Sequence, residues 1–450
     1  KLRLSYGMAG ADNIDASLWR ETWESTTVTF NGQTYSGYKP SGMLSNPDLK
    51  WETTISRNIG LDFGFFNNRL SGTIDAYWNT TKDLLMCIPI DETTGYSYQY
   101  QNIGQTSNKG IEIALNYDVI RTKDFTLGVS ATYNYNHNNI DELADNIIAQ
   151  YGSQWASSAT TPTYDYEFRE GKPVGLIRGY ICDGYYTTAD FNYDPATKTY
   201  TLKPGVADLG NLVGNYPSHY NLPEGQKAFP GAVKLRDLDG NGVADTEDVA
   251  DLGEITHPHT GGFNLNMTWK DIDFSAGFAW ATGGHVYNVN SLINMYGNKD
   301  TGAGANKLEF ISDCYQIYDI QNGELVPVVE PDALDALNTG AKYGVPYMEN
   351  GTVLSTFVED ASFLRLNTLT VGYTFPKAWT KKIGMQRARV YATAGNLFTI
   401  TGYSGIDPEV NADPNKSTTA ANTGNYPLLG MDYGTYPRAR TFTFGVNITF

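Results

Sequence analysis

Apolar and polar residues alternate along ten separate stretches of the chain. A period of two is typical of a β-strand that has one apolar and one polar face. In the stretch at 69–81, Leu70, Ile74 and Trp78 share one face, while Thr73 and Asp75 share the other. Each stretch has about the length that a tilted membrane strand needs. The ten stretches lie near residues 1–9, 51–66, 69–81, 109–120, 124–136, 261–270, 272–283, 363–375, 387–399 and 439–450.

The connections between these stretches alternate in length. The even-numbered ones are short or moderate, at 67–69, 121–123, 270–271 and 376–386. The others are medium at 82–108 and long at 10–50, 137–260, 284–362 and 400–438. A soluble β-sandwich also alternates along its strands, but it has no reason to sort its loops in this way. Outer-membrane barrels combine short periplasmic turns with long extracellular loops. The pattern therefore predicts an all-β fold, a transmembrane antiparallel β-barrel.

One charged residue interrupts an apolar face, because Arg57 falls in line with Ile55, Ile59 and Leu61. A lipid-facing arginine costs roughly 2–4 kcal/mol at the middle of the membrane and little near its surface. We expect the Arg57 side chain to reach the outer rim of the barrel, unless the register breaks there.

Composition is compatible with a membrane barrel and argues against several other classes. The chain has 450 residues, of which 41% are apolar, and no run of about 20 consecutive apolar residues that a membrane helix requires. Its net charge of −17 argues against a nucleic-acid partner. The three cysteines, Cys87, Cys182 and Cys314, lack the spacing of a metal site.

Nothing in the sequence indicates catalysis. No nucleophile-elbow or P-loop motif is present, and no pair of carboxylates is fixed at the separation that a glycosidase needs. We expect that the protein is not an enzyme. A barrel hydrolase and a glycan-binding adhesin that uses only its loops stay open as alternatives.

The sharpest local motif is DLDGNGVADTED, residues 237–248, within the long loop at 137–260. It matches the spacing of a calcium-binding loop, with Gly242 at the sharp turn. Asp248 stands where such loops usually carry glutamate, so Mg²⁺ is an alternative to Ca²⁺. We expect a structural ion that rigidifies the loop. The ligand positions are Asp237, Asp239, Asn241, Val243 (through its carbonyl), Asp245 and Asp248.

Aromatic residues in the long loops are candidates for binding substrate, because rings stack on sugars and on peptide side chains. These candidates are Trp19, Trp23, Tyr151, Trp155, Tyr164, Tyr166 and Tyr296. We expect residues 182–191 and the Pro- and Gly-rich segment 204–231 to form irregular surface loop.

Five segments, in order from the first strand to the last, resemble the SusC/RagA family of TonB-dependent transporters of Bacteroidetes. They are NPDLKWETTISRNIGLDFGFFNNRLSGTIDAYWNTTKDLL (46–85), NIGQTSNKGIEIALNYDVI (102–120), VKLRDLDGNGVADTEDVADLG (233–253), VEDASFLRLNTLTVGYTFP (358–376) and ARVYATAGNLFTITGYSGIDPEV (388–410).

The resemblance implies a 22-stranded outer-membrane barrel with a plugged lumen, of which residues 1–450 would supply about the last ten strands. It implies import of oligosaccharides, or alternatively oligopeptides, driven by TonB, with a SusD-like lipoprotein as a lid. The plug, the TonB contact and the other strands would lie in an N-terminal portion outside this sequence. Ten strands leave two open edges, which lipid does not tolerate, so we expect that portion to complete the barrel.

Overall fold

The computed structural model describes residues 1–11, 18–143, 149–151, 166–210, 219–295, 309–346, 353–410, 430–432 and 434–450. None of the helices in this part of the chain is both long and apolar enough to cross a membrane.

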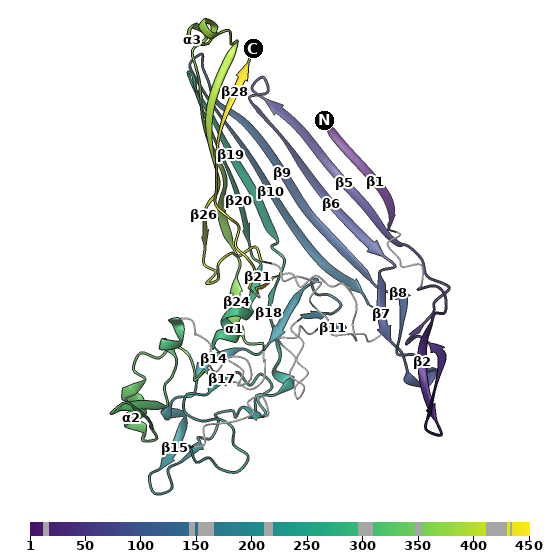
Figure 1. Cartoon of the computed structure of the whole chain (residues 1–450), viewed down its shortest axis with the longest axis vertical. Coiled ribbons are helices and arrows are strands. Elements are labelled where there is room, and N and C mark those ends of the chain that lie inside the picture. Colours follow the sequence, from purple (N-terminus) through teal and green to yellow (C-terminus); the bar gives the residue numbers. More distant parts are fainter. Residues whose placement is uncertain are drawn as a thin grey trace.

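Ten long antiparallel strands form one curved sheet, in which successive members of the set lie side by side (Figure 1). Each coincides with one predicted stretch, so the predicted β-barrel strands are confirmed. The strands at the middle of the sheet extend beyond their predicted ends. The ten are β1 (Leu2–Ala11), β5 (Glu52–Phe65), β6 (Leu70–Lys82), β9 (Gln105–Arg121), β10 (Phe125–Glu142), β19 (His259–Trp269), β20 (Ile272–Thr282), β25 (Phe363–Thr374), β26 (Arg387–Thr401) and β28 (Thr441–Thr449).

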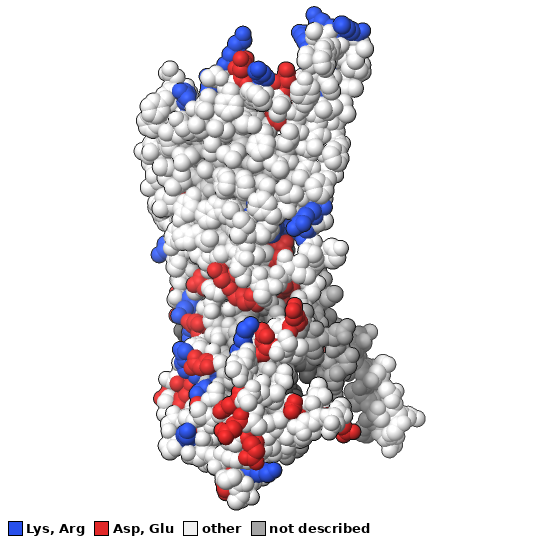
Figure 2. Space-filling view, turned by 90° about the vertical axis from the view of Figure 1, so that its left-hand side faces the viewer, with Lys and Arg blue, Asp and Glu red and all other residues white. Residues whose placement is uncertain are grey.

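The register keeps apolar residues on one face of the sheet. Leu4 pairs with Ile59 across β1 and β5, and Val390 pairs with Val446 across β26 and β28. This face stays open to the surroundings, since Phe444 is 80% exposed. Figure 2 shows a broad band without charged residues, between a charged rim and the charged loop end. Such a band is what a lipid-facing surface requires.

The short connections all lie at one end of the sheet, called the turn end here, and the long ones lie at the other, the loop end (Figure 1). The fourth short connection contains α3 (Lys377–Thr380) and a 3₁₀ helix (Lys381–Ile383). The alternation in connection length therefore corresponds to two different ends of the molecule, as predicted.

Glycines in the sheet let long polar side chains cross a strand and bond to the next one. Tyr77 of β6 lies over Gly110 of β9, and its hydroxyl donates to Oδ1 of Asn136 on β10 at 2.9 Å. A Cβ at Gly110 would lie 2.6 Å from the Tyr77 hydroxyl. Near β1, Arg3 passes over Gly60 to Asp75 in the same way, at 2.8 Å.

The first two long connections carry small sheets of their own. β2 (Trp23–Phe30) and β3 (Gln33–Pro40) form a hairpin. The other sheet has three strands in the order β4, β8, β7. Its strands are β4 (Met43–Leu44), β7 (Leu85–Pro89) and β8 (Tyr98–Asn102), with a 3₁₀ helix at Glu92–Thr94.

The other three long connections contain many short elements. The strands are β11 (Ala149–Tyr151), β12 (Tyr166–Phe168), β13 (Leu176–Gly179), β14 (Cys182–Tyr185), β15 (Phe191–Asp194), β16 (Thr199–Leu202), β17 (Val233–Leu235), β18 (Ala250–Glu254), β21 (His285–Asn288), β22 (Tyr318–Gln321), β23 (Glu324–Pro327), β24 (Val358–Asp360) and β27 (Met431–Asp432). The helices are α1 (Val289–Met295), α2 (Pro331–Leu337) and 3₁₀ turns at Thr188–Asp190, Thr246–Asp248, Glu309–Asp313 and Ser355–Phe357.

Candidate functional site

The last three long connections pack into one body, which we call the loop domain: the described residues of 143–258, 284–362 and 402–440. Its centre is apolar and rich in tyrosine, and Tyr180, Tyr186 and Tyr200 are fully buried. A three-stranded sheet in the order β24, β21, β27 draws on two of the three connections. Tyr180, from the third, forms a β-bridge with Leu354. The loop domain is therefore a folded unit at the loop end of the barrel strands (Figure 1).

This packing corrects one sequence-based expectation. Residues 182–191 and 204–231 are not simply irregular surface loop, because Phe191 is 4% exposed and Phe229 1% exposed. Phe191 packs against Tyr186 and Tyr200, and Phe229 packs against Tyr220, all within the same connection. A period of two marks strands and gives no sign of such ring packing within a loop.

The acidic loop at 237–248 joins two small sheets of the loop domain. It follows β17, which pairs with β14, and it precedes β18, which pairs with β13. Gly240 and Gly242 have φ of 79° and 91°, conformations that favour glycine and turn the chain sharply. Val243 forms a β-bridge with Asp208, which anchors the loop from its other side.

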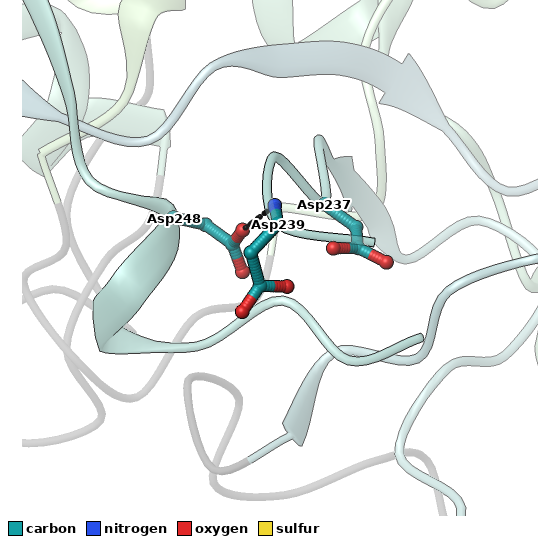
Figure 3. A group of neighbouring side chains, drawn as sticks. All are labelled: Asp237, Asp239 and Asp248. Carbon is teal, nitrogen blue, oxygen red and sulfur yellow. Dashed lines mark hydrogen bonds between the residues drawn. The ribbon is translucent and has the colours of Figure 1, made fainter. Parts of the chain in front are cut away.

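Three carboxylates of this loop converge (Figure 3). Asp237, Asp239 and Asp248 each offer an oxygen, and the three oxygens lie within 4.8 Å of one another. Asp248 is fully buried, and its Oδ1 accepts from the backbone N–H of Leu238 at 2.6 Å. Its Oδ2 accepts from the N–H of Asp245 at 2.8 Å. The innermost carboxylate is therefore fixed by backbone donors.

Backbone donors also hold Asp237 in its ionised form. Its two carboxylate oxygens accept from the N–H groups of Gly240, at 2.7 Å, and Gly242, at 2.8 Å. The hydrogen bond from Gly242 is the main reason that the pKa of Asp237 lies below its ordinary value. Charged oxygens at close range are the ligands that Ca²⁺ prefers.

The other three predicted ligands lie beside this cluster. The Asn241 side chain donates to Asp239 Oδ2 at 3.0 Å and to Asp245 Oδ2 at 3.3 Å. The backbone bonds that join Val243 to Asp208 use the carbonyls of Gly242 and Asp208, not the carbonyl of Val243. Of the six predicted ligands, Asp237, Asp239 and Asp248 therefore converge, whereas Asp245 lies outside that group. Oδ1 of Asn241 accepts from the N–H of Val243 at 2.8 Å.

The predicted aromatic residues are scattered. Trp19 and Trp23 are more than half exposed, near the hairpin of β2 and β3. Tyr166 is 5% exposed in the core of the loop domain, which corrects the expectation that its ring is presented to a ligand. Tyr151 lies on β11, and its side chain lies outside the described part. Trp155, Tyr164 and Tyr296 lie outside the described residues.

The polar face of the sheet carries a connected set of amides that the sequence-based candidates did not include. Asn108 Oδ1 accepts from Nδ2 of Asn136 at 3.2 Å and from Nδ2 of Asn138 at 2.9 Å. Tyr77 donates to the other end of the Asn136 amide. The sequence pattern contains only part of this signal, because Asn136 ends the predicted strand at 124–136, whereas Asn108 and Asn138 lie just outside the predicted strands.

Comparison with known proteins explains this architecture. A family model for TonB-dependent receptor-like β-barrels matches residues 2–222. TonB-dependent receptor SusC of Bacteroides thetaiotaomicron is 29% identical over 457 aligned residues, which cover all of this chain. The solved structure of the RagAB peptide transporter matches all of the chain with a TM-score of 0.68 and 25% identity. The chain belongs to the SusC/RagA family.

Membership in the SusC/RagA family locates the sheet in the outer membrane, because TonB-dependent receptor barrels lie there. TonB-dependent receptor P3 of Formosa agariphila is another relative, 31% identical over the whole chain. The chain spans about two fifths of the length of these relatives, 39% of receptor P3 and 37% of SusC. The sheet and loop domain thus correspond to part of a SusC/RagA-type barrel and its long loops.

Proposed function

We propose that this chain forms the wall and the extracellular loops of a TonB-dependent importer of oligosaccharides in a Bacteroidetes-like outer membrane. The observation that carries the proposal is the match of the whole chain to SusC and RagA, which includes the loop domain as well as the strands. A SusD-like lipoprotein would cover the loop end, and TonB would supply the energy.

The unpaired edges of the sheet support a longer barrel. β1 pairs with β5, and β28 pairs with β26, and neither has a second partner among the described residues. Lipid does not tolerate exposed backbone donors and acceptors. We propose that both edges pair with further strands of the same transporter, whose lumen holds a plug.

The chemistry of the polar face favours a sugar as cargo. Neutral amides and hydroxyls line it at Asn108, Asn136, Asn138 and Tyr77, and such groups exchange hydrogen bonds with the hydroxyls of a sugar. Oligopeptides are the second candidate, because RagAB is named as a peptide transporter.

A binding panel tests the cargo. The purified transporter, with its lid lipoprotein, is titrated against neutral oligosaccharides and against peptides of matched mass by isothermal calorimetry. We expect saturable binding of an oligosaccharide and at least tenfold weaker binding of every peptide. Tight binding of peptides alone would contradict the oligosaccharide assignment, and release of shorter sugars would indicate a hydrolase.

We propose further that Ca²⁺ binds the loop at 237–248 and rigidifies the loop domain, with Asp237, Asp239, Asn241, Val243, Asp245 and Asp248 as ligands. The ion would tie β17 and β18 together through the carboxylates between them. The test is limited proteolysis in Ca²⁺ and in EDTA. We expect faster cleavage within 137–260 in EDTA and recovery on adding Ca²⁺. Equal cleavage rates would contradict a structural ion.

A further inference from the structure

A row of basic and aromatic side chains crosses the apolar face of the sheet near its loop end. Trp78 on β6 pairs with Lys109 on β9, and Lys109 pairs with His137 on β10. Ile55 pairs with Thr80 and Asn58 with Tyr77, so the same register sets Arg57 of β5 opposite Trp78. We call Arg57, Trp78, Lys109 and His137 the basic row.

The row has no counterpart elsewhere on the described part of this face. On the other half of the sheet, the loop end carries Trp280, Leu364 and Ile400, which are paired side by side and uncharged. The basic row therefore makes one side of the barrel surface cationic at this level.

The cations of the row are available to an external anion. Lys109 and His137 are exposed, and Trp78 between Arg57 and Lys109 is 42% exposed. Arg57 donates to Oγ1 of Thr80 at 3.4 Å, and Thr80 lies nearer the loop end of β6 than Trp78, so the guanidinium points toward the loop end. This long bond uses one of five guanidinium donors. Neither Arg57 nor Lys109 forms an ion pair with a described carboxylate.

One carboxylate lies in reach of the row, but it has other partners. Asp141, at the end of β10, attracts Lys109 electrostatically. Its Oδ1 accepts from Ser107 and from Asn139, both at 2.8 Å. Asp141 is thereby held by neutral donors of its own surroundings, and the outer side of Lys109 stays open.

The basic row lies at the level along the barrel axis where lipid headgroups are expected. Strands that rise about 3.3 Å per residue and tilt by about 40° place Trp78 about 20 Å above Leu70 at the turn end. The apolar band of such barrels is about 25 Å tall. Below the row, exposed Ile59, Ile74 and Ile111 offer an apolar surface for acyl chains.

We propose that the basic row binds the phosphate-bearing headgroup of an anionic lipid in the outer leaflet, with its acyl chains on the apolar face below. Phosphate would accept from Arg57 and Lys109, and His137 would add a third donor. The same contact would stabilise the charge of Arg57 on a lipid-facing strand. This inference concerns the outer surface of the barrel and does not depend on the cargo.

Native mass spectrometry of the detergent-purified, folded transporter tests the proposal. The probes are dioleoyl phosphatidic acid, dioleoyl phosphatidylcholine and inorganic phosphate. We expect wild-type protein to retain phosphatidic acid at least tenfold more tightly than phosphatidylcholine, and millimolar inorganic phosphate to compete poorly. Equal retention of the two lipids, or full competition by inorganic phosphate, would overturn the proposal without any variant being made.

Matched variants locate the site. R57Q/K109Q removes two charges from the row, and K123Q/K382Q removes two exposed charges from the turn end. A surface cation contributes about fourfold to tenfold to binding of an anionic lipid, so we expect R57Q/K109Q to weaken phosphatidic acid binding about tenfold or more. K123Q/K382Q should change the affinity for phosphatidic acid by less than twofold. Equal losses in both variants would overturn the assignment to the row, and a heat-modifiability gel shows that each variant is folded.

Discussion

At the scale of single residues, glycines decide where polar side chains can cross the sheet. Gly110 faces the Tyr77 ring and the carbonyl oxygen of Tyr135, and a Cβ there would lie 2.0 Å from that oxygen. Gly7, on β1 of the same sheet, has no atom within 4 Å of such a Cβ. The two glycines therefore have different roles, although both occur within alternating strands.

We predict that G110A destabilises the barrel and that G7A does not. The added methyl group must displace backbone of β10 and the Tyr77 side chain, and overpacking of this kind costs about 1–3 kcal/mol. The measurement is the temperature at which the folded, heat-modifiable form is lost on a gel. A fall for G110A with no change for G7A is expected, whereas equal behaviour of the two variants would contradict this account.

At the scale of elements, the strands could be predicted from the sequence and the loop domain could not. Alternation fixes a strand locally, so Phe442, Phe444 and Val446 alone identify β28. The core of the loop domain joins Tyr180 to Leu354 and Tyr287 to Met431, pairs that no local pattern connects. The proximity of Asp237, Asp239 and Asp248 could be predicted, because the three carboxylates lie within twelve consecutive residues.

The acidic loop provides the prediction at this scale, with D248N compared with D194N. Asp248 is buried among backbone donors, while Asp194 caps the turn of the hairpin of β15 and β16 in the same domain. We expect D248N to abolish the protection from proteolysis that Ca²⁺ gives, and D194N to keep it. Loss of protection in both variants, or in neither, would count against this ion site.

The protection from proteolysis that Ca²⁺ gives should depend on pH. The pKa of Asp237 is lowered in the folded loop, so its carboxylate stays ionised below the ordinary aspartate range. The ionised Asp237 carboxylate contributes fully to ion binding and to loop stability above about pH 4. This contribution is lost as pH falls through the lowered pKa. Protection by Ca²⁺ should therefore persist at pH 5 and decline below about pH 4.

At the scale of the whole molecule, the chain combines a lipid-facing sheet with a folded domain at its loop end. Relatives that share both parts are TonB-dependent receptors. The alternation of short and long connections indicated an outer-membrane barrel from the sequence, and only the resemblance of five segments indicated the family. The kind of cargo could not be predicted from the sequence, because the candidate aromatic residues of the long loops can stack on sugars and on peptide side chains alike. An importer also differs from an adhesin in its need for energy.

Energy-dependent import is tested most directly by the uptake of a fluorescent oligosaccharide, chosen from the binding panel, into cells that make the transporter with or without TonB. We predict that both strains bind the sugar at the surface and that only cells with TonB accumulate it in a protease-protected form. Equal accumulation in the two strains, or surface binding with no accumulation in either, would contradict energy-dependent import.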